Sequence, residues 1–225
     1  VTTLKNSTQQ VAERQGGKHP QGAIVTLDGC SGKVRALAGG TDFVKYPFNR
    51  AYQAKRPAGS VFKPLVYATA LTLGWRPDSS ISDSPLIVKA GNGKIWKPKN
   101  FSGTFHGKVT LLEALTNSYN IPAIRLLQSS GVKTVRELAK RSGIHAKMNS
   151  DLSLALGTVD VSPLEMTAAY TPFICRGTTA EPRFIDFMED SKGTQIYRQK
   201  KNATQVVSAK VAAEMKYMLK NVVNE

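Results

Sequence analysis

Two runs of β-forming residues near the N-terminus limit what this chain can fold into. The stretch GAIVTLDGCSGKVRALAGG, residues 22–40, places them on either side of a Gly-rich turn from Asp28 to Gly32, which predicts a β-hairpin. A two-stranded hairpin is only marginally stable alone, so these strands need partners in a sheet. Few candidate strands follow within the chain, and we therefore expect more strands beyond Glu225.

Helical signals fill the middle of the sequence. Apolar residues recur at helical spacing after Ser60 until Gly74 stops the helix, and residues 75–108 are irregular and partly extended. Capping boxes at 110–113 and 162–165 predict helices through Asn117 and up to Gly177. The remaining expected elements are helices over 122–131, 133–142 and 208–222 and a hairpin within 184–197. This order predicts a mixed α/β fold with a largely helical middle.

The charge balance is unusual, with 31 Lys and Arg against 16 Asp and Glu, a net charge of +15. Residues 1–110 hold 16 of the basic and 5 of the acidic side chains. This excess favours polyanionic surroundings, but no nucleic-acid motif accompanies it, so we expect no nucleic-acid partner. Residues 1–20 are polar and are predicted to be a linker or arm, which leaves 21–225 as one domain.

Cysteine and histidine give no metal-binding pattern. Cys30 and Cys175 are far apart without a Cys-x-x-Cys motif, and sequence alone leaves open whether they are paired. His19, His106 and His145 lack metal-ligand spacing and are interpreted as structural or surface residues. We expect neither a metal nor a cofactor.

The first chemical signal is Pro-Ala-Gly-Ser60-Val-Phe-Lys63-Pro. A lysine three residues after a serine at the start of a helix puts both side chains on one face, within a turn. The positive end of the helix dipole favours developing negative charge on the serine oxygen, and a desolvated lysine can act as a base. A second Ser-x-x-Lys match, Ser130 to Lys133, crosses a predicted helix boundary and is interpreted as accidental.

The second signal is Ser118-Tyr-Asn120, at a predicted break between two helices. Serine and asparagine also favour such corners simply as capping residues. However, a serine there can relay a proton, and an asparagine amide can hold a substrate carbonyl. A Ser-x-Asn corner after a Ser-x-x-Lys helix is typical of active-site serine penicillin-recognising enzymes.

The flanks of both motifs strengthen this resemblance. FNRAYQAKRPAGSVFKPLVYATAL resembles the first catalytic motif of class A penicillin-binding proteins, and WKPKNFSGTFHGKVTLLEALTNSYNIPAIRL resembles the segment with their second motif. LALGTVDVSPLEMTAAYTPFICRGT resembles the helix that follows, so the likeness covers the chain from about residue 22. It implies a β-lactamase/transpeptidase-like fold, an antiparallel sheet with a helical subdomain.

The resemblance also implies roles for the motif residues. Ser60 would be the acylated nucleophile and Lys63 its base partner, Ser118 would assist proton transfer, and Asn120 would bind the substrate's amide backbone. The implied reaction is D,D-transpeptidation at D-Ala-D-Ala stem peptides, with β-lactams acylating the same serine. The resemblance further implies an extracytoplasmic domain, with a membrane anchor and a glycosyltransferase domain upstream.

One family motif is absent. The family's third motif, Lys-Thr-Gly or Lys-Ser-Gly, does not occur, since Lys133-Thr134 is followed by valine and Arg176-Gly177-Thr178 has the wrong order. We expect its strand to follow Glu225, together with the strands that the N-terminal hairpin lacks. These 225 residues alone are therefore expected to be inactive.

Three alternatives remain open. A serine β-lactamase of class A needs a glutamate that activates water, but the chain has no Glu-x-x-Leu-Asn segment, and Glu165 is explained by its capping box. A D,D-carboxypeptidase would share the nucleophile and differ in the acceptor. A non-catalytic basic module that binds an anionic polymer would explain the charge but not the motifs.

Overall fold

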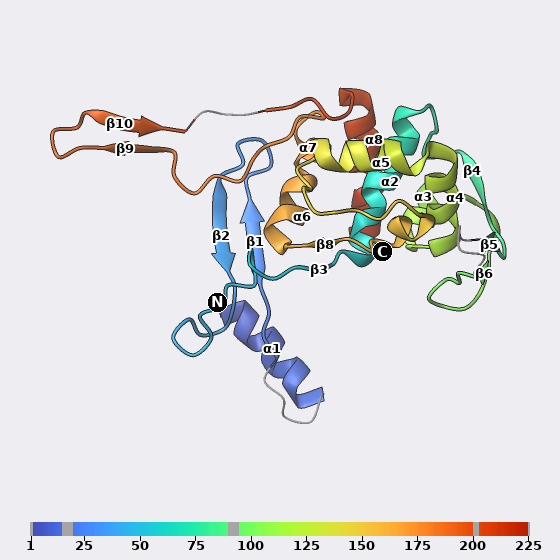
Figure 1. Ribbon diagram of the computed structural model, residues 1–225, viewed down its shortest axis with the longest axis horizontal. Coiled ribbons are helices and arrows are strands. Elements are labelled where there is room, and N and C mark those ends of the chain that lie inside the picture. The colour runs from blue at the N-terminus through green and yellow to red at the C-terminus, as the bar shows by residue number, and fades with distance from the viewer. Residues whose placement is uncertain (1, 15–19, 90–94, 200–202, 225) are drawn as a thin grey trace.

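The computed structural model describes residues 2–14, 20–89, 95–199 and 203–224. Figure 1 shows a helical body on one side and, on the other, the N-terminal helix, the hairpin β1–β2 and the projecting hairpin β9–β10. The described part of the chain thus has the mixed α/β architecture expected from the sequence. None of its helices is both long and apolar enough to cross a membrane.

Helix α2 (Lys63–Thr72) forms the centre of the helical body (Figure 1). Its residues from Lys63 to Leu71 are all buried, because it packs against helices on several sides rather than along one apolar stripe. Its neighbours are η1 (Gly59–Phe62), α3 (Leu111–Thr116), α4 (Asn120–Ser130), α5 (Val132–Arg141), η2 (Leu152–Leu156) and α8 (Ala209–Asn224). The methionines of α8 that face this body, Met215 and Met218, are fully buried, as expected for core residues.

The described strands pair two by two, and every pair is antiparallel. The pairs are β1 (Ile24–Leu27) with β2 (Val34–Ala38), β3 (Arg56–Pro57) with β8 (Asp160–Val161), β4 (Ser80–Asp83) with β7 (Gly107–Thr110), β5 (Val88–Lys89) with β6 (Ile95–Trp96), and β9 (Phe187–Glu189) with β10 (Gln195–Arg198). Both predicted hairpins are therefore confirmed. The first contains an irregularity in register between Thr26 and Leu27.

The helix predicted from Ser162 to Gly177 is wrong in its length. It is divided into α6 (Pro163–Ala169) and α7 (Thr171–Ile174), with Tyr170 between them. Pro172 accounts for the break, because proline has no N–H to continue the ladder of helical hydrogen bonds. The Thr171 hydroxyl instead donates to the Ala168 carbonyl at 2.8 Å.

The two predicted capping boxes differ in completeness. Ser162 and Glu165 bond to each other's backbone N–H groups, so the box at the start of α6 is complete. At α3, the Thr110 hydroxyl accepts a hydrogen bond from the Glu113 N–H at 3.1 Å, which is the serine/threonine half of a box.

The polar segment predicted as an arm contains a helix, α1 (Thr2–Arg14). Leu4 and Ala12 are buried, and Leu4 lies against Gly22 at the beginning of the domain. The two apolar positions are eight residues apart, or about two turns, so one narrow stripe anchors an otherwise polar helix. The expected boundary at residue 21 remains a prediction.

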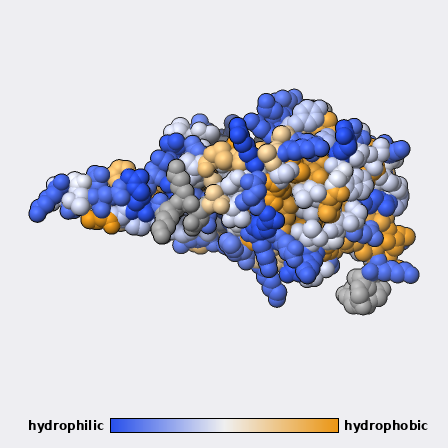
Figure 2. Space-filling model, turned by 90° about the horizontal axis from the view of Figure 1, so that it is seen from above, coloured by the Kyte–Doolittle hydropathy of each residue, from blue (hydrophilic) through white to orange (hydrophobic). Residues whose placement is uncertain are grey.

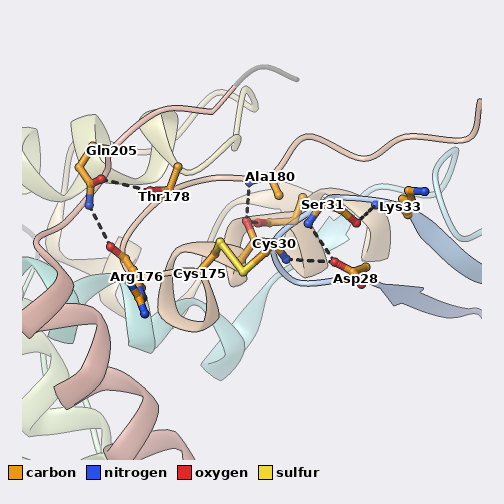
Figure 3. The surroundings of a disulfide bond; sticks show 11 residues. Asp28, Cys30, Ser31, Lys33, Cys175, Arg176, Thr178, Ala180 and Gln205 are labelled. Carbon is orange, nitrogen blue, oxygen red and sulfur yellow. Dashed lines mark hydrogen bonds between the residues drawn. A yellow bond between two sulfur atoms is a disulfide. The ribbon is translucent and has the colours of Figure 1, made fainter. Parts of the chain in front are cut away.

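Cys30 and Cys175 form a disulfide, with their Cα atoms 5.0 Å apart. Figure 3 shows that the bond joins the β1–β2 turn to the end of α7. The β1–β2 turn is further held by Asp28, whose carboxylate accepts a hydrogen bond from the Ser31 N–H at 2.9 Å. The disulfide therefore fixes the N-terminal hairpin to the segment that follows α6.

Candidate active site

Ser60 lies in the 3-10 turn η1, directly before α2, and its side chain is exposed. The turn is held against the chain segment that leads into β8, because the Ala58 N–H donates to the Val159 carbonyl at 2.9 Å and the Gly59 N–H donates to the Gly157 carbonyl at 3.1 Å. The helix predicted from Ser60 thus begins as a 3-10 turn and becomes an α-helix at Lys63. Pro64 occupies the first turn of α2, as expected from its missing N–H.

The backbone of Gly157 lies very close to the turn that carries Ser60. Its φ is +72°, and a Cβ at this position would lie 2.1 Å from the Gly59 carbonyl oxygen. Only glycine fits both the left-handed backbone and this separation. The residue was not singled out in the sequence, where one glycine among 18 carries no distinguishing signal.

Lys63 is buried, and its ammonium bonds to the Ser-x-Asn corner. Its Nζ atom lies 2.5 Å from the Ser118 carbonyl oxygen, 3.0 Å from Ser118 Oγ and 2.8 Å from Asn120 Oδ1. These three acceptors match the three N–H donors of an ammonium group. No ion pair among the described residues involves Lys63.

Burial lowers the pKa of Lys63 to about 8. The cause is the loss of water around the charged form, since no carboxylate of the described residues lies within ion-pair distance to stabilise that form. A substantial fraction of the lysine is therefore neutral slightly above neutral pH, which is what a proton acceptor requires.

The Ser-x-Asn corner has an unusual backbone. Ser118 adopts a φ of +54°, in the left-handed region that side chains other than glycine, asparagine and aspartate rarely enter. α3 ends before this residue and α4 begins at Asn120, which confirms the predicted helix break. Ser118 is exposed to solvent while its Oγ lies against Lys63, and the Asn120 amide nitrogen donates to the Lys99 carbonyl at 2.9 Å.

The structure therefore brings three of the four predicted site residues, Lys63, Ser118 and Asn120, into direct contact. Ser60 is one turn from Lys63, but the hydrogen bonds of the described residues include none between their side chains. Catalytic hydrogen bonds are often long before substrate binds, so this spacing does not exclude the pair.

The second Ser-x-x-Lys match has no comparable surroundings. Ser130 is the last residue of α4 and is buried, whereas Lys133 lies in α5 and is exposed near Glu137. Gly131, with a φ of +82°, separates the two helices. The match crosses a helix boundary, as predicted.

Glu165 has structural partners. Its carboxylate accepts from Lys55 Nζ at 2.6 Å and from the backbone N–H groups of His145 and Ser162 at 3.0 and 3.4 Å. Partial burial alone would raise the pKa of Glu165, but these hydrogen bonds and the charge of Lys55 together lower it. A carboxylate with these partners is a poor candidate for a water-activating base.

Behind the corner lie two buried polar residues, Asn100 and Asp83, and the more exposed His106 bonds to Asp83. Asn100 Oδ1 accepts from the Asn120 backbone N–H at 2.8 Å, and Asn100 Nδ2 donates to the Asp83 carboxylate at 2.9 Å. His106 is interpreted from the sequence as a structural or surface residue, and nothing in the sequence singles out Asn100 or Asp83. A lone aspartate and asparagine in an irregular segment give no pattern that would predict this contact.

A buried lysine that bridges a Ser-x-x-Lys turn and a Ser-x-Asn corner, on a mixed α/β fold, defines an acyl-transferring domain of the active-site serine class. The family described as the penicillin binding protein transpeptidase domain matches residues 22–225. This chain belongs to that family.

Relatives and solved structures agree with this assignment. Penicillin-binding protein 1A of Neisseria lactamica is 43% identical over 176 residues, which cover 77% of this chain and 22% of the relative. Penicillin-binding protein 1A of Pseudomonas aeruginosa is 37% identical over 180 residues, which cover 79% of this chain and 22% of the relative. The crystal structure of penicillin-binding protein 1A from Haemophilus influenzae matches 92% of this chain and 36% of that chain, with a TM-score of 0.84 and 28% identity. The chain thus spans about a fifth of the length of the curated relatives it matches.

Proposed function

We propose that this domain catalyses D,D-transpeptidation of peptidoglycan stem peptides through an ester on Ser60. The observation that carries the proposal is the buried Lys63 ammonium, one turn from Ser60 and hydrogen-bonded to both Ser118 and Asn120. A lysine whose pKa is lowered by burial can accept the proton of a nearby hydroxyl, so no histidine is needed.

The reaction proceeds in two acyl transfers. Neutral Lys63 takes the proton of Ser60 as Oγ attacks the carbonyl carbon of the penultimate D-alanine. The C–N bond to the terminal D-alanine then breaks, and the leaving amine receives a proton through Lys63 and Ser118. An amine of a neighbouring stem peptide attacks the ester, loses its proton to the same groups, and releases Ser60 with formation of the cross-link.

Two further groups orient the acyl donor. The Asn120 amide nitrogen carries two hydrogens, of which one bonds to the Lys99 carbonyl, and the second holds a backbone carbonyl of the substrate. The positive end of the helix dipole at η1 and α2 stabilises negative charge on the carbonyl oxygen. A β-lactam carbonyl enters the same position, so β-lactams acylate Ser60.

The domain works on the extracytoplasmic face of the cell membrane. The Cys30–Cys175 disulfide supports this location, because disulfides persist mainly in oxidising compartments. A glycosyltransferase domain and a membrane anchor precede the domain in the full-length protein, in keeping with the small share of its relatives that the chain spans.

Two enzymatic alternatives make different predictions. A β-lactamase would turn β-lactams over rapidly, and the structural partners of Glu165 argue against it. A D,D-carboxypeptidase would pass the acyl group to water, whereas a transpeptidase yields a cross-linked product when an amine acceptor is supplied.

Intact mass spectrometry of the full-length protein, with and without benzylpenicillin, tests the proposal. We expect one stable penicilloyl-sized increment, which peptide mapping assigns to Ser60 and which Ser60→Ala abolishes. Ser130→Ala, at the other Ser-x-x-Lys match, is the matched control and should be acylated normally. Normal acylation of folded Ser60→Ala would show that the assignment is wrong.

A further inference from the structure

Helix α4 lacks an N-terminal cap of its own. Its N-cap residue is Tyr119, whose side chain makes no capping hydrogen bond, so the first N–H groups of the helix need an acceptor from elsewhere. Asn100, 20 positions earlier in the chain, supplies it. Its Oδ1 accepts from the Asn120 N–H at 2.8 Å and from the Ile121 N–H at 3.3 Å.

The Asn100 amide is itself fixed in orientation. Its Nδ2 donates to both carboxylate oxygens of Asp83 at 2.9 Å and to the Thr104 carbonyl at 2.9 Å. Both side chains are buried, with Asp83 fully inaccessible and Asn100 4% exposed. An amide between a carboxylate and two N–H groups has only one favourable orientation, because flipping it would place oxygen against oxygen.

Asp83 is also linked to the corner through His106. It accepts from the His106 backbone N–H at 3.0 Å and lies 2.8 Å from His106 Nδ1. The His106 ring stacks on the Tyr119 ring, with centroids 4.2 Å apart and planes 10° from parallel. The buried carboxylate is therefore linked to both Tyr119 and Asn120, the last two residues of the Ser-x-Asn motif.

The corner needs such support because Ser118 is held in a strained backbone conformation. Its φ of +54° persists only where the surroundings fix the residues on both sides. Lys63 binds the Ser118 carbonyl on one side, and Asn100 binds the Asn120 N–H on the other. These two bonds fix the corner from both sides of Ser118.

We propose that Asn100, oriented by Asp83, is a positioning residue that holds Ser118 and Asn120 at the distance from Lys63 that acylation of Ser60 requires. The inference rests on the proposed function. In the described structure no hydrogen bond of the Asn100 side chain reaches Ser60 or Lys63, so Asn100 acts through the backbone of Asn120. A displacement of about 1 Å at such a site is enough to cost about 100-fold in rate.

The test is the acylation of the full-length protein by a fluorescent penicillin, followed in time. The fraction of molecules finally labelled reports how much protein is folded, whereas the rate constant reports the geometry of the folded site. We expect Asn100→Ala to lower the rate constant by about 10- to 100-fold in the labelled fraction. Asn117→Ala is the matched control: this exposed asparagine directly precedes the corner, and in the described part of the chain its side chain bonds only to the Glu113 carbonyl, so the rate constant should change less than about twofold.

A charge exchange tests the role of Asp83. Asn100→Asp should be at least as slow as Asn100→Ala, because it places a second carboxylate against Asp83 and removes the donor. When Asp83→Asn is added, the amide at position 83 can donate to the carboxylate at position 100. The rate constant of the double variant should therefore be at least about fivefold higher than that of Asn100→Asp.

The outcomes separate the two hypotheses. Absence of acylation at Ser60 in the unsubstituted protein overturns the proposed function. Normal acylation there, together with an Asn100→Ala rate constant within threefold of the unsubstituted value, overturns only the positioning role. If Asn100→Ala yields no folded protein, the comparison between Asn100→Asp and the double variant decides, and equal rate constants overturn the inference.

Discussion

Lys63 Nζ and Asn120 Oδ1, 57 positions apart in the chain, are joined by a 2.8 Å hydrogen bond. This bond connects the two motifs that the sequence shows only as separate signals. It also explains how a buried ammonium without a carboxylate partner is kept in place, since oxygen atoms of the Ser-x-Asn corner take all three of its donors. The proton affinity of Lys63 and the shape of the corner are therefore linked, and several predictions concern that link.

The rate of acylation should depend on pH through Lys63. Its pKa of about 8 lies below the ordinary value of 10.5, so the neutral form that accepts the Ser60 proton increases as pH rises through 8. We expect the second-order rate constant for benzylpenicillin to increase between pH 6.5 and 8 and to level off above about pH 9. Stopped-flow fluorescence across this range measures it.

Lys63→Arg provides the control for this pH dependence. Arginine keeps the positive charge but does not lose its proton in this range, so the rate should fall by about 10²- to 10⁴-fold. A flat profile in the unsubstituted protein, from pH 6.5 to 9, would contradict a proton-accepting role for Lys63.

Gly157→Ala should slow acylation although Gly157 is not in either motif. The added methyl would lie 2.1 Å from the Gly59 carbonyl oxygen, and the turn that carries Ser60 must move to relieve the contact. We expect a loss of at least about tenfold in the acylation rate constant and a lower Tm.

Gly143→Ala is the matched control for this substitution. Gly143 has a φ of +99°, and nothing lies within 4 Å of its would-be Cβ, so only the backbone strain is shared. Its Tm should fall with little change in acylation. Equal rate losses in the two variants would show that the close approach to Gly59 is unimportant.

Much of this fold could be predicted because its signals are local. Gly-rich turns between β-forming runs, capping boxes and helix-ending glycines all act within a few residues, and the structure confirms both hairpins and most helices. The features that were missed or left open depend on distant partners. Helix α1 is anchored by Leu4 against Gly22, and the pairing of Cys30 with Cys175 depends on how the hairpin docks on α7.

The candidate site likewise contains residues that local motifs predict and one residue, Asn100, that they do not. Ser60 and Lys63 share one turn, and Ser118 and Asn120 share one corner, so each pair has a pattern that a sequence can show. Asn100 acquires its place only when the loop that carries it folds against the first residues of α4. No periodicity indicates that contact, because an isolated asparagine in a loop usually serves the turn in which it lies.

Glu165→Gln should leave the β-lactam chemistry unchanged while lowering stability. Glutamine can still complete the capping box of α6, but it removes the ion pair with Lys55 and the negative charge at the start of the helix, so the substitution should cost about 0.5–1 kcal/mol in the free energy of unfolding. Denaturant titration measures that loss, and mass spectrometry over time measures the lifetime of the penicilloyl ester. A markedly longer-lived ester in Glu165→Gln would indicate that Glu165 activates water, as in a β-lactamase.

Removal of the disulfide should destabilise the domain substantially. Cys30 and Cys175 close a loop with a sequence separation of 145, and cross-links across loops of this size typically contribute about 2–5 kcal/mol. We expect the double variant Cys30→Ala/Cys175→Ala to lose free energy of unfolding in that range. Dithiothreitol should lower the stability of the unsubstituted protein to a similar extent and leave the double variant unchanged, since no other thiol exists in the chain. If both proteins respond equally to dithiothreitol, or neither does, the two cysteines are not paired in solution.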